Sequence, residues 1–260
     1  MHEPGLAVEA GTMNVYWLGQ SAADVPVLNN WLSAGELARL KGMRFEKRRA
    51  DFRLGRWTAK RALSAYLNLP ADFAAMAGIE IRPEPSGAPE VFLADKLADV
   101  TISLSHRAGT AICAIAASGV ALGCDLEVIE PRSDAFLADY FTTEEQEFVA
   151  CVQASERSQI LALLWSAKES ALKALREGLR LDTRSLRVEA VAAEMQEEGQ
   201  IRDSALTSCP SFVADIWHPL YVRFGADQVF QGWWQHANDV LRTMVATPFP
   251  SQPILLVITK

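Results

Sequence analysis

Long hydrophobic runs are absent from this sequence. The most apolar stretches, residues 111–122 and 160–165, are far shorter than the roughly 20 residues that a membrane-spanning helix needs. Cysteine is also scarce: the four cysteines form no CxxC pair and have no histidine at zinc-ligand spacing, so we expect neither a disulfide framework nor a zinc site. Residues 1–11 contain no basic segment before an apolar run, unlike a signal peptide. We therefore expect a cytoplasmic protein.

Positive charge is in deficit over the chain as a whole. The 25 Lys and Arg residues against 32 Asp and Glu residues give a formal net charge of −7, which argues against a general nucleic-acid binder. Residues 41–61 are the exception, because they hold nine basic residues against two acidic ones. This concentration predicts one anionic ligand bound at one place.

The basic segment also has the pattern of a helix over residues 45–68, since it lacks proline and places apolar residues at helical spacing. Four cations form one stripe beside that apolar face: Arg49, Arg53, Arg56 and Lys60. Two interpretations stay open. The stripe binds phosphate groups, or it is a solvated face whose long side chains cover apolar surface.

The remaining pattern predicts an α/β or α+β protein of two similar lobes, which we place at residues 1–119 and 120–260. Short strands are expected at residues 14–18, 80–82, 101–104, 111–116 and 120–129, with a loop at 83–89 and a turn at 105–110. A helical block begins with the capping-box pattern Thr142-x-x-Glu145 and continues to Gly178. The rest is expected to be strand-rich, with one short helix near 232–243.

Two carboxylates stand two residues apart in the expected strand at 120–129. Asp125 and Glu127 alternate with Cys124, Leu126 and Val128, so a strand directs both acids to one side. Oxygen ligands of this kind suit Mg²⁺, which takes one or two protein carboxylates and completes its shell with waters and phosphates. The alternative is an exposed strand face.

Two further clusters carry polar side chains. Trp165, Glu169 and Lys173 follow at steps of four on one helix face, with Lys168 beside them. They form either a plain Glu169–Lys173 salt bridge or a partly buried polar site. The run Ser103–His106 enters a turn that either binds a phosphate or satisfies its own backbone.

Taken in order, these motifs resemble the Sfp-type 4′-phosphopantetheinyl transferases over roughly residues 38–190. They are R-L-G-R-x-x-x-K (53–60), S-L-S-H (103–106), G-C-D-L-E (123–127), F-T-x-x-E (141–145) and W-S-A-K-E-S-A-L-K-A (165–174). The resemblance implies a fold of two lobes related by pseudo-twofold symmetry, with the site at their junction. It also implies transfer of the phosphopantetheine arm of coenzyme A to a serine of an acyl or peptidyl carrier protein, releasing 3′,5′-ADP.

The same resemblance implies roles for individual residues. Mg²⁺ would be held by Asp125, Glu127 and Glu169, with Glu169 also the candidate base. Lys173 would bind the pyrophosphate and stabilise charge on it. The 3′-phosphate and adenosine would be bound by Lys41, Arg49, Arg53, Ser105 and His106.

One position departs from the family pattern. Ala88 stands in the loop Gly87-Ala-Pro89 where the family often has lysine, and Arg82 is the candidate replacement. We expect a monomer without nucleic-acid or membrane partners. Two other functions stay open: a coenzyme A or carrier-protein binding module without turnover, and a hydrolase of the coenzyme A pyrophosphate.

Overall fold

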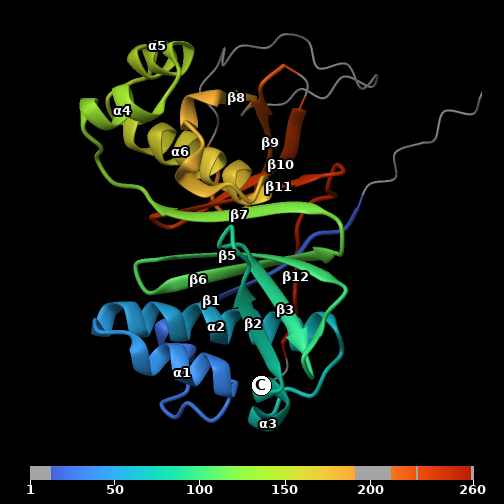
Figure 1. The fold of residues 1–260 in the computed structure, drawn as a ribbon. Helices are drawn as coiled ribbons and strands as arrows, with labels where there is room; N and C mark the ends of the chain where they lie inside the picture. Colours follow the sequence, from blue (N-terminus) through green and yellow to red (C-terminus); the bar gives the residue numbers. More distant parts are fainter. Residues whose placement is uncertain (1–12, 191–211, 227, 259–260) are drawn as a thin grey trace, which may run out of the picture.

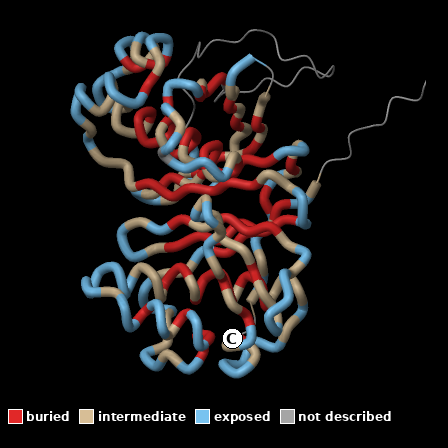
Figure 2. Tube along the Cα trace, viewed as in Figure 1, coloured by how far each residue is buried: buried red, intermediate tan, exposed pale blue. Residues whose placement is uncertain are grey.

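The computed structural model describes residues 13–190, 212–226 and 228–258, which form two lobes stacked on one another (Figure 1). Within these ranges no helix is both long and apolar enough to cross a membrane. In each lobe one long helix packs on a mainly antiparallel sheet. The two sheets face each other across the middle of the molecule, where the buried residues are concentrated (Figure 2).

The N-terminal lobe contains a four-stranded sheet in the order β12-β1-β6-β5 and a small sheet in the order β2-β3-β4. Its strands are β1 (Tyr16–Ser21), β2 (Ile79–Pro83), β3 (Pro89–Leu93), β4 (Lys96–Leu97), β5 (Val100–Arg107) and β6 (Thr110–Ala117). Its helices are α1 (Ala34–Gly42), α2 (Glu46–Tyr66) and α3 (Phe73–Ala77). Helix α2 packs on β6, β1 and β5, as its apolar spacing predicts.

The C-terminal lobe is built around a five-stranded sheet in the order β7-β11-β10-β9-β8. Its strands are β7 (Ala121–Val128), β8 (Leu186–Ala190), β9 (Trp217–Phe224), β10 (Gln228–Ala237) and β11 (Val240–Thr247). Its helices are α4 (Asp134–Tyr140), α5 (Thr143–Cys151) and α6 (Arg157–Ala174). Helix α6 packs mainly on β7 and β11.

The two lobes repeat one another in element order and in strand pairing. Strand β1 is followed by α1 and α2 and pairs antiparallel with β6, just as β7 is followed by α5 and α6 and pairs antiparallel with β11. The hairpins β5–β6 and β10–β11 correspond in the same way. The predicted mixed α/β fold with two similar lobes is confirmed.

A buried Glu–Lys pair occurs in the N-terminal lobe. Glu36 closes the capping box of α1 with Ser33, accepts a hydrogen bond from the Ile81 backbone in β2, and lies 2.5 Å from Lys60 of α2. Lys60 also donates to the carbonyls of Trp31 and Met76. Glu36 and Lys60 are both 0% exposed, so each charge is compensated by the other in a site that water does not reach.

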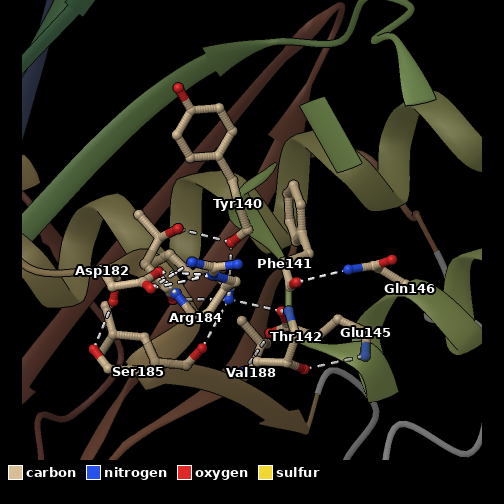
Figure 3. Close-up of polar contacts among 12 residues, drawn as sticks. Tyr140, Phe141, Thr142, Glu145, Gln146, Asp182, Arg184, Ser185 and Val188 are labelled. Atoms are coloured by element: carbon tan, nitrogen blue, oxygen red, sulfur yellow. Dashed lines mark hydrogen bonds and ion pairs between the residues drawn. The ribbon is translucent and has the colours of Figure 1, made fainter. Parts of the chain in front are cut away.

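The C-terminal lobe contains the same arrangement, of which Figure 3 labels Thr142, Glu145 and Val188. Glu145 closes the capping box of α5 with Thr142, accepts from the Val188 backbone in β8, and lies 2.7 Å from Lys168 of α6. Lys168 donates to backbone carbonyls, including those of Thr183 and Leu186. The repeat is also visible in the sequence as Trp57-Thr-Ala-Lys60 and Trp165-Ser-Ala-Lys168.

The lobes meet through β5 and β7. Ser103 Oγ accepts a hydrogen bond from the Cys124 backbone at 2.9 Å, and Ser105 Oγ accepts one from Leu126 at 3.2 Å. Beside these contacts lies an apolar core shared by both lobes, with residues from β1, β6, β7 and β11. The junction is therefore packed and hydrogen-bonded, which fixes β7 against the N-terminal lobe.

Several sequence predictions need correction. Residues 232–243 form strands β10 and β11 with a turn between them, and not a helix. Residues 105–107 belong to strand β5, so the expected turn shrinks to 108–109. The expected helical block from Thr142 is two helices, α5 and α6, and α6 ends at Ala174 before Gly178.

The proposed division into residues 1–119 and 120–260 stays a prediction. Strand β12 (Ile254–Leu255) lies in the N-terminal lobe, because it pairs in parallel with β1.

Candidate active site at the lobe junction

Strand β7 positions the two predicted carboxylates at the junction between the lobes. Alternation places Cys124 and Leu126 in the shared apolar core and turns Asp125 and Glu127 to the other side. The exposed fractions of Asp125 and Glu127 are 4% and 8%. An exposed strand face is therefore excluded, and both acids are buried polar groups that need partners.

Asp125 is held from both sides. Lys173 Nζ of α6 lies 2.7 Å from Asp125 Oδ1, and Ser105 Oγ of β5 donates to the same oxygen at 2.9 Å. Lys173 also donates to the Cys124 carbonyl at 2.9 Å. Burial alone would lower the pKa of Lys173, but the electrostatic interactions with Asp125, Cys124 and Glu169 and the hydrogen bond to Asp125 together outweigh burial and raise it, so Lys173 remains an ammonium.

Close approach of α6 to β7 makes these contacts possible. A Cβ atom on Gly123 would lie 1.8 Å from the Ser170 carbonyl oxygen, so only glycine fits between the strand and the helix. This spacing brings Lys173, one turn after Ser170, within reach of Asp125.

Glu127 faces cations from two other segments. Arg132 donates to Glu127 Oε2 at 3.1 Å, and Arg107 Nε of β5 lies 3.7 Å from it. Burial and then the nearby Asp125 raise the pKa of Glu127, while Arg107, Arg132 and a hydrogen bond from Trp165 oppose the shift. The positive neighbours thus cancel part of the increase that burial causes in the pKa of this carboxyl.

Glu169 completes the predicted set from helix α6. Burial, followed by the charges of Asp125 and Glu127, raises the pKa of Glu169 to about 7, and Lys173 offsets part of this effect. The three acids therefore act on one another electrostatically, although they come from two distant stretches of chain. Lys173 forms its ion pair with Asp125, so the plain Glu169–Lys173 salt bridge does not describe this face.

The donor set can be compared with what Mg²⁺ requires. Within the described part of the chain no three His, Cys, Asp or Glu side chains are placed as a ready-made metal cluster. However, Asp125 Oδ2 is buried and receives no hydrogen bond, and the facing groups are carboxylates, the oxygen ligands that Mg²⁺ prefers. Because Mg²⁺ needs only one or two protein carboxylates, these residues fit it; the three-ligand assignment stays a prediction.

A cavity of about 700 Å³ opens beside the acids. One wall comes from α2 and β5, a second from Leu122 of β7 and residues at and just beyond the end of α6, and a third from the loop between β2 and β3. Lys173 lines the cavity and also holds Asp125, so it joins the cavity to the acidic site. The other cationic or polar side chains that argue for an anionic ligand are Arg48, Arg56, Ser103, His106 and Arg176.

The predicted coenzyme A residues are distributed unevenly around this cavity. His106 lines it, whereas Ser105 uses its hydroxyl on β7. Lys41 and Arg49 are exposed on the surface, and the cavity wall includes neither. Arg53 donates to the carbonyls of Pro26 and Val27, away from the cavity wall. The binding roles of Lys41, Arg49 and Arg53 remain untested predictions.

The basic stripe is also divided between different tasks. Lys60 is buried against Glu36 and so is not available to a phosphate, which corrects the four-cation stripe. Arg48 and Arg56, with Phe52 between them, form the face that reaches the cavity. Residues 48, 52 and 56 follow at steps of four and so share one side of a helix, and this spacing could have indicated the face from the sequence. Arg82, expected to replace the missing loop lysine, binds Glu80 and Asp95 instead.

Fold and site together define a two-lobed α/β protein with buried carboxylates and cations beside a cavity at its junction. A family model described as the 4′-phosphopantetheinyl transferase superfamily matches residues 121–215. The chain is 28% identical over 166 residues to the 4′-phosphopantetheinyl transferase HetI of Nostoc sp. (strain PCC 7120), with 62% of this chain and 67% of that protein covered. The chain is therefore similar to 4′-phosphopantetheinyl transferases, through the family model in its C-terminal lobe and through this relative over a longer stretch.

Two solved structures are also similar in part. The first is Helicobacter pylori holo-[acyl-carrier-protein] synthase in complex with coenzyme A, with a TM-score of 0.32 and 21% identity, covering 40% of this chain and 99% of that one. The second is a Bacillus anthracis holo-(acyl-carrier-protein) synthase in complex with CoA (3′,5′-ADP), with a TM-score of 0.35 and 20% identity, covering 41% and 97%.

Proposed function

We propose that this protein transfers the 4′-phosphopantetheine arm of coenzyme A to a serine hydroxyl of an acyl or peptidyl carrier protein and releases 3′,5′-ADP. The observation that carries the proposal is the double role of Lys173, which lines the cavity and ion-pairs with Asp125 at 2.7 Å. A phosphorylated ligand in the cavity would therefore reach the acidic site through one side chain. The similarity to 4′-phosphopantetheinyl transferases supports the same reaction.

Coenzyme A would bind with its nucleotide in the cavity. Arg48 and Arg56 of α2 and His106 of β5 are the N-terminal groups that face this space, and each can donate to phosphate oxygens. Burial lowers the pKa of Arg56 to about 10, which still leaves it charged at neutral pH. Positive charge thus reaches the cavity from both lobes: from α2 in the N-terminal lobe and from Lys173 in the C-terminal lobe.

The carboxylates would hold Mg²⁺ beside the pyrophosphate. We assign this role to Asp125 and Glu127 on β7 and to Glu169 on α6. When bound, Mg²⁺ would neutralise charge on the phosphate oxygens and help to orient them. Binding it would also relieve the repulsion that raises the pKa of Glu169.

Glu169 and Lys173 would act on the reacting groups. A carboxyl whose pKa is about 7 is matched to neutral pH, so Glu169 is suited to remove the proton of the attacking serine hydroxyl. Lys173 would stabilise the negative charge that develops on the leaving 3′,5′-ADP. Ser105 would keep Asp125 in place, because its hydroxyl bridges Asp125 Oδ1 and the Leu126 backbone.

The setting of this reaction is part of the proposal. We assign the protein to the cytoplasm as a monomer, with the carrier protein docking where the acidic site opens between the lobes. No nucleic acid or membrane takes part.

The test incubates the purified protein with coenzyme A, Mg²⁺ and an apo carrier protein, and follows both partners by mass spectrometry. We expect the carrier to gain the mass of the phosphopantetheine arm. Asp125→Ala and Glu169→Gln should each lower the rate at least about 100-fold while the protein stays folded. Glu147→Gln, at an exposed position of α5, is the matched control and should leave the rate unchanged.

Other outcomes identify the competing functions. Cleavage of coenzyme A without a change in carrier mass would indicate a pyrophosphohydrolase. Binding without turnover of either molecule would indicate a non-catalytic binding module. Near-normal activity of Asp125→Ala or Glu169→Gln at low Mg²⁺ would contradict the assignment of these residues.

A further inference from the structure

Arg176 lies on the cavity wall just beyond the end of helix α6. Helix α6 ends in a Schellman motif, in which the Arg176 backbone donates to Lys173 O at 3.0 Å and the Glu177 backbone donates to Leu172 O at 3.2 Å. Arg176 occupies the position of this motif that normally takes glycine. Its φ of +59° lies in the left-handed region, where a side chain costs free energy.

The Arg176 side chain crosses to the other lobe. Its Nη1 lies 3.1 Å from Glu84 Oε1 in the loop between β2 and β3. This loop is a compact turn, since Glu84 and Ala88 are joined through their backbones at 2.9 Å and Ser86 donates to Glu84 at 2.7 Å. The Arg176–Glu84 pair therefore spans two walls of the cavity.

The ion pair alone does not account for an arginine at this position. The exposed fractions of the Arg176 and Glu84 side chains are 46% and 19%, and an ion pair so open to water contributes little to stability. Glycine would form the same helix end without strain. What arginine adds is a guanidinium at the cavity, one helical turn from Lys173.

We propose that Arg176 binds a phosphate group of coenzyme A in the cavity, and that Glu84 occupies its guanidinium until the ligand displaces it. A phosphate carries more negative charge than a carboxylate and offers more acceptor oxygens, so the exchange favours the ligand. This inference rests on the proposed function, because it takes coenzyme A as the occupant of the cavity. It adds Arg176 as a substrate-binding residue supplied by the C-terminal lobe.

The test measures coenzyme A binding by calorimetry in Mg²⁺ without a carrier protein. Arg176→Gly removes the guanidinium and suits the backbone, so it should weaken binding about tenfold without lowering the melting temperature. Glu84→Gln removes the competitor and should tighten binding about threefold. Arg184→Ala, an exposed arginine paired with Asp182 away from the cavity wall, is the matched control and should bind like the wild type.

A transfer assay gives a second readout. Arg176→Gly should raise the KM for coenzyme A and leave kcat within about threefold, since the contact is made equally before and during reaction. A penalty that disappears with 3′-dephospho-coenzyme A places Arg176 on the 3′-phosphate, and one that persists places it on the pyrophosphate.

The inference is wrong if Arg176→Gly binds coenzyme A within twofold of the wild type. It is also wrong if Glu84→Gln weakens binding as much as Arg176→Gly, because the pair would then only fasten the loop. A folded wild-type protein that does not bind coenzyme A would instead contradict the proposed function.

Discussion

Lys173 is the residue on which the two parts of the site depend. Its ammonium neutralises Asp125, which is 4% exposed and would otherwise be a buried charge facing two other acids. The same group is available at the cavity wall. Positive charge and carboxylate oxygens are therefore both in place at the junction before any ligand binds.

The raised pKa of Glu169 predicts how stability changes with pH. Since the folded pKa is about 7 and the ordinary value is 4.5, the folded protein holds a proton that the unfolded chain has lost between these values. This contribution is complete below pH 4.5, falls as pH rises, and is lost above pH 7. From pH 6 to pH 8 the melting temperature of the metal-free wild type should fall relative to Glu169→Gln, on the order of 3 °C.

Thermal unfolding of both proteins at several pH values, in a chelator, checks this prediction. Added Mg²⁺ should raise the wild-type melting temperature more at pH 8 than at pH 6. If the melting temperatures of the two proteins change in parallel with pH, the pKa of Glu169 is not raised in the folded protein.

Gly123 offers a second prediction at this scale. Gly123→Ala should destabilise the protein by about 3 kcal/mol or more, because the new Cβ would overlap the Ser170 carbonyl at 1.8 Å. Gly55→Ala is the matched control: no atom outside its own helix lies within 4 Å of its Cβ, and alanine should stabilise α2 by about 0.5–1 kcal/mol. Urea unfolding measures both. A Gly123→Ala protein as stable as the wild type would contradict the close packing of β7 on α6.

Sequence predicted the placement of the acidic side chains better than that of the basic ones. Alternation in one strand is enough to place Asp125 and Glu127 on one face, because strand geometry has a period of two. The stripe ending at Lys60 could not be interpreted in the same way, since the partner of Lys60, Glu36, comes from another helix. The role of a long cationic side chain depends on which groups from other elements it contacts in the fold. Helical spacing does not predict those contacts.

At the level of elements, the buried Glu–Lys pair is the feature that each lobe repeats. In both lobes it joins the start of a short helix, the middle of the long helix and the backbone of the strand that follows. Three elements are fixed by one pair of charges. The pair thus sets how the long helix lies relative to the sheet, and with it the direction of Glu169 and Lys173 on α6.

Breaking either pair should cost similar free energy if the lobes are equivalent. Lys60→Met and Lys168→Met should each destabilise the protein by about 3 kcal/mol, because each removes the cation closest to a fully buried carboxylate. Chemical denaturation measures the cost. Lys47→Met, at an exposed position of α2, serves as the control and should change stability by less than about 0.5 kcal/mol. A negligible cost at either buried position would show that its pair is not structural.

Helices and strands were predicted well where capping residues and apolar spacing indicate the same element. They were predicted poorly where pairing with a distant strand determines the structure. Thr142 and Glu145 form the predicted capping box, and the predicted helix at 45–68 is α2 at Glu46–Tyr66. Residues 232–243 became a hairpin because Gly232 packs on the Met244 carbonyl of the partner strand, where a Cβ would lie 1.9 Å away. Asn238, with a φ of +53°, turns the chain between the strands.

At the scale of the whole molecule, the end of the described chain crosses from one lobe to the other. After β11 the chain returns to the N-terminal lobe, where the backbones of Ile254 and Leu256 donate to the carbonyls of Val15 and Trp17. Leu256 and Ile258 pack against the core beneath α2. The two lobes are thus tied together at β12 as well as at the β5–β7 contact (Figure 1).

Removing residues 252–260 should loosen the N-terminal lobe in particular. Loss of two partly buried apolar side chains and the pairing of β12 should lower stability by about 2 kcal/mol, or roughly 4–8 °C in melting temperature. Hydrogen exchange should show the largest loss of protection along β1. Val257→Ser, at a side chain that is 89% exposed, should change neither quantity. Unchanged protection in β1 would mean that β12 contributes nothing to this sheet.

Two lobes at the whole-molecule scale were predictable, but the tie between them was not. Strand and helix signals recur in each half, so the lobes follow from the pattern. The segment around Ile254 carries no signal for its partner, because parallel pairing with a strand more than 230 residues earlier leaves no trace in local sequence.

The pairing of β12 with β1 means that the N-terminal sheet can be completed only after β12 has been synthesised. Strand β1 leaves the ribosome more than 230 residues before Ile254, so one edge of the first sheet has no neighbour while the intervening chain is made. An open strand edge invites pairing with other nascent chains. The N-terminal half is therefore the part that we expect to depend most on chaperones while synthesis is in progress.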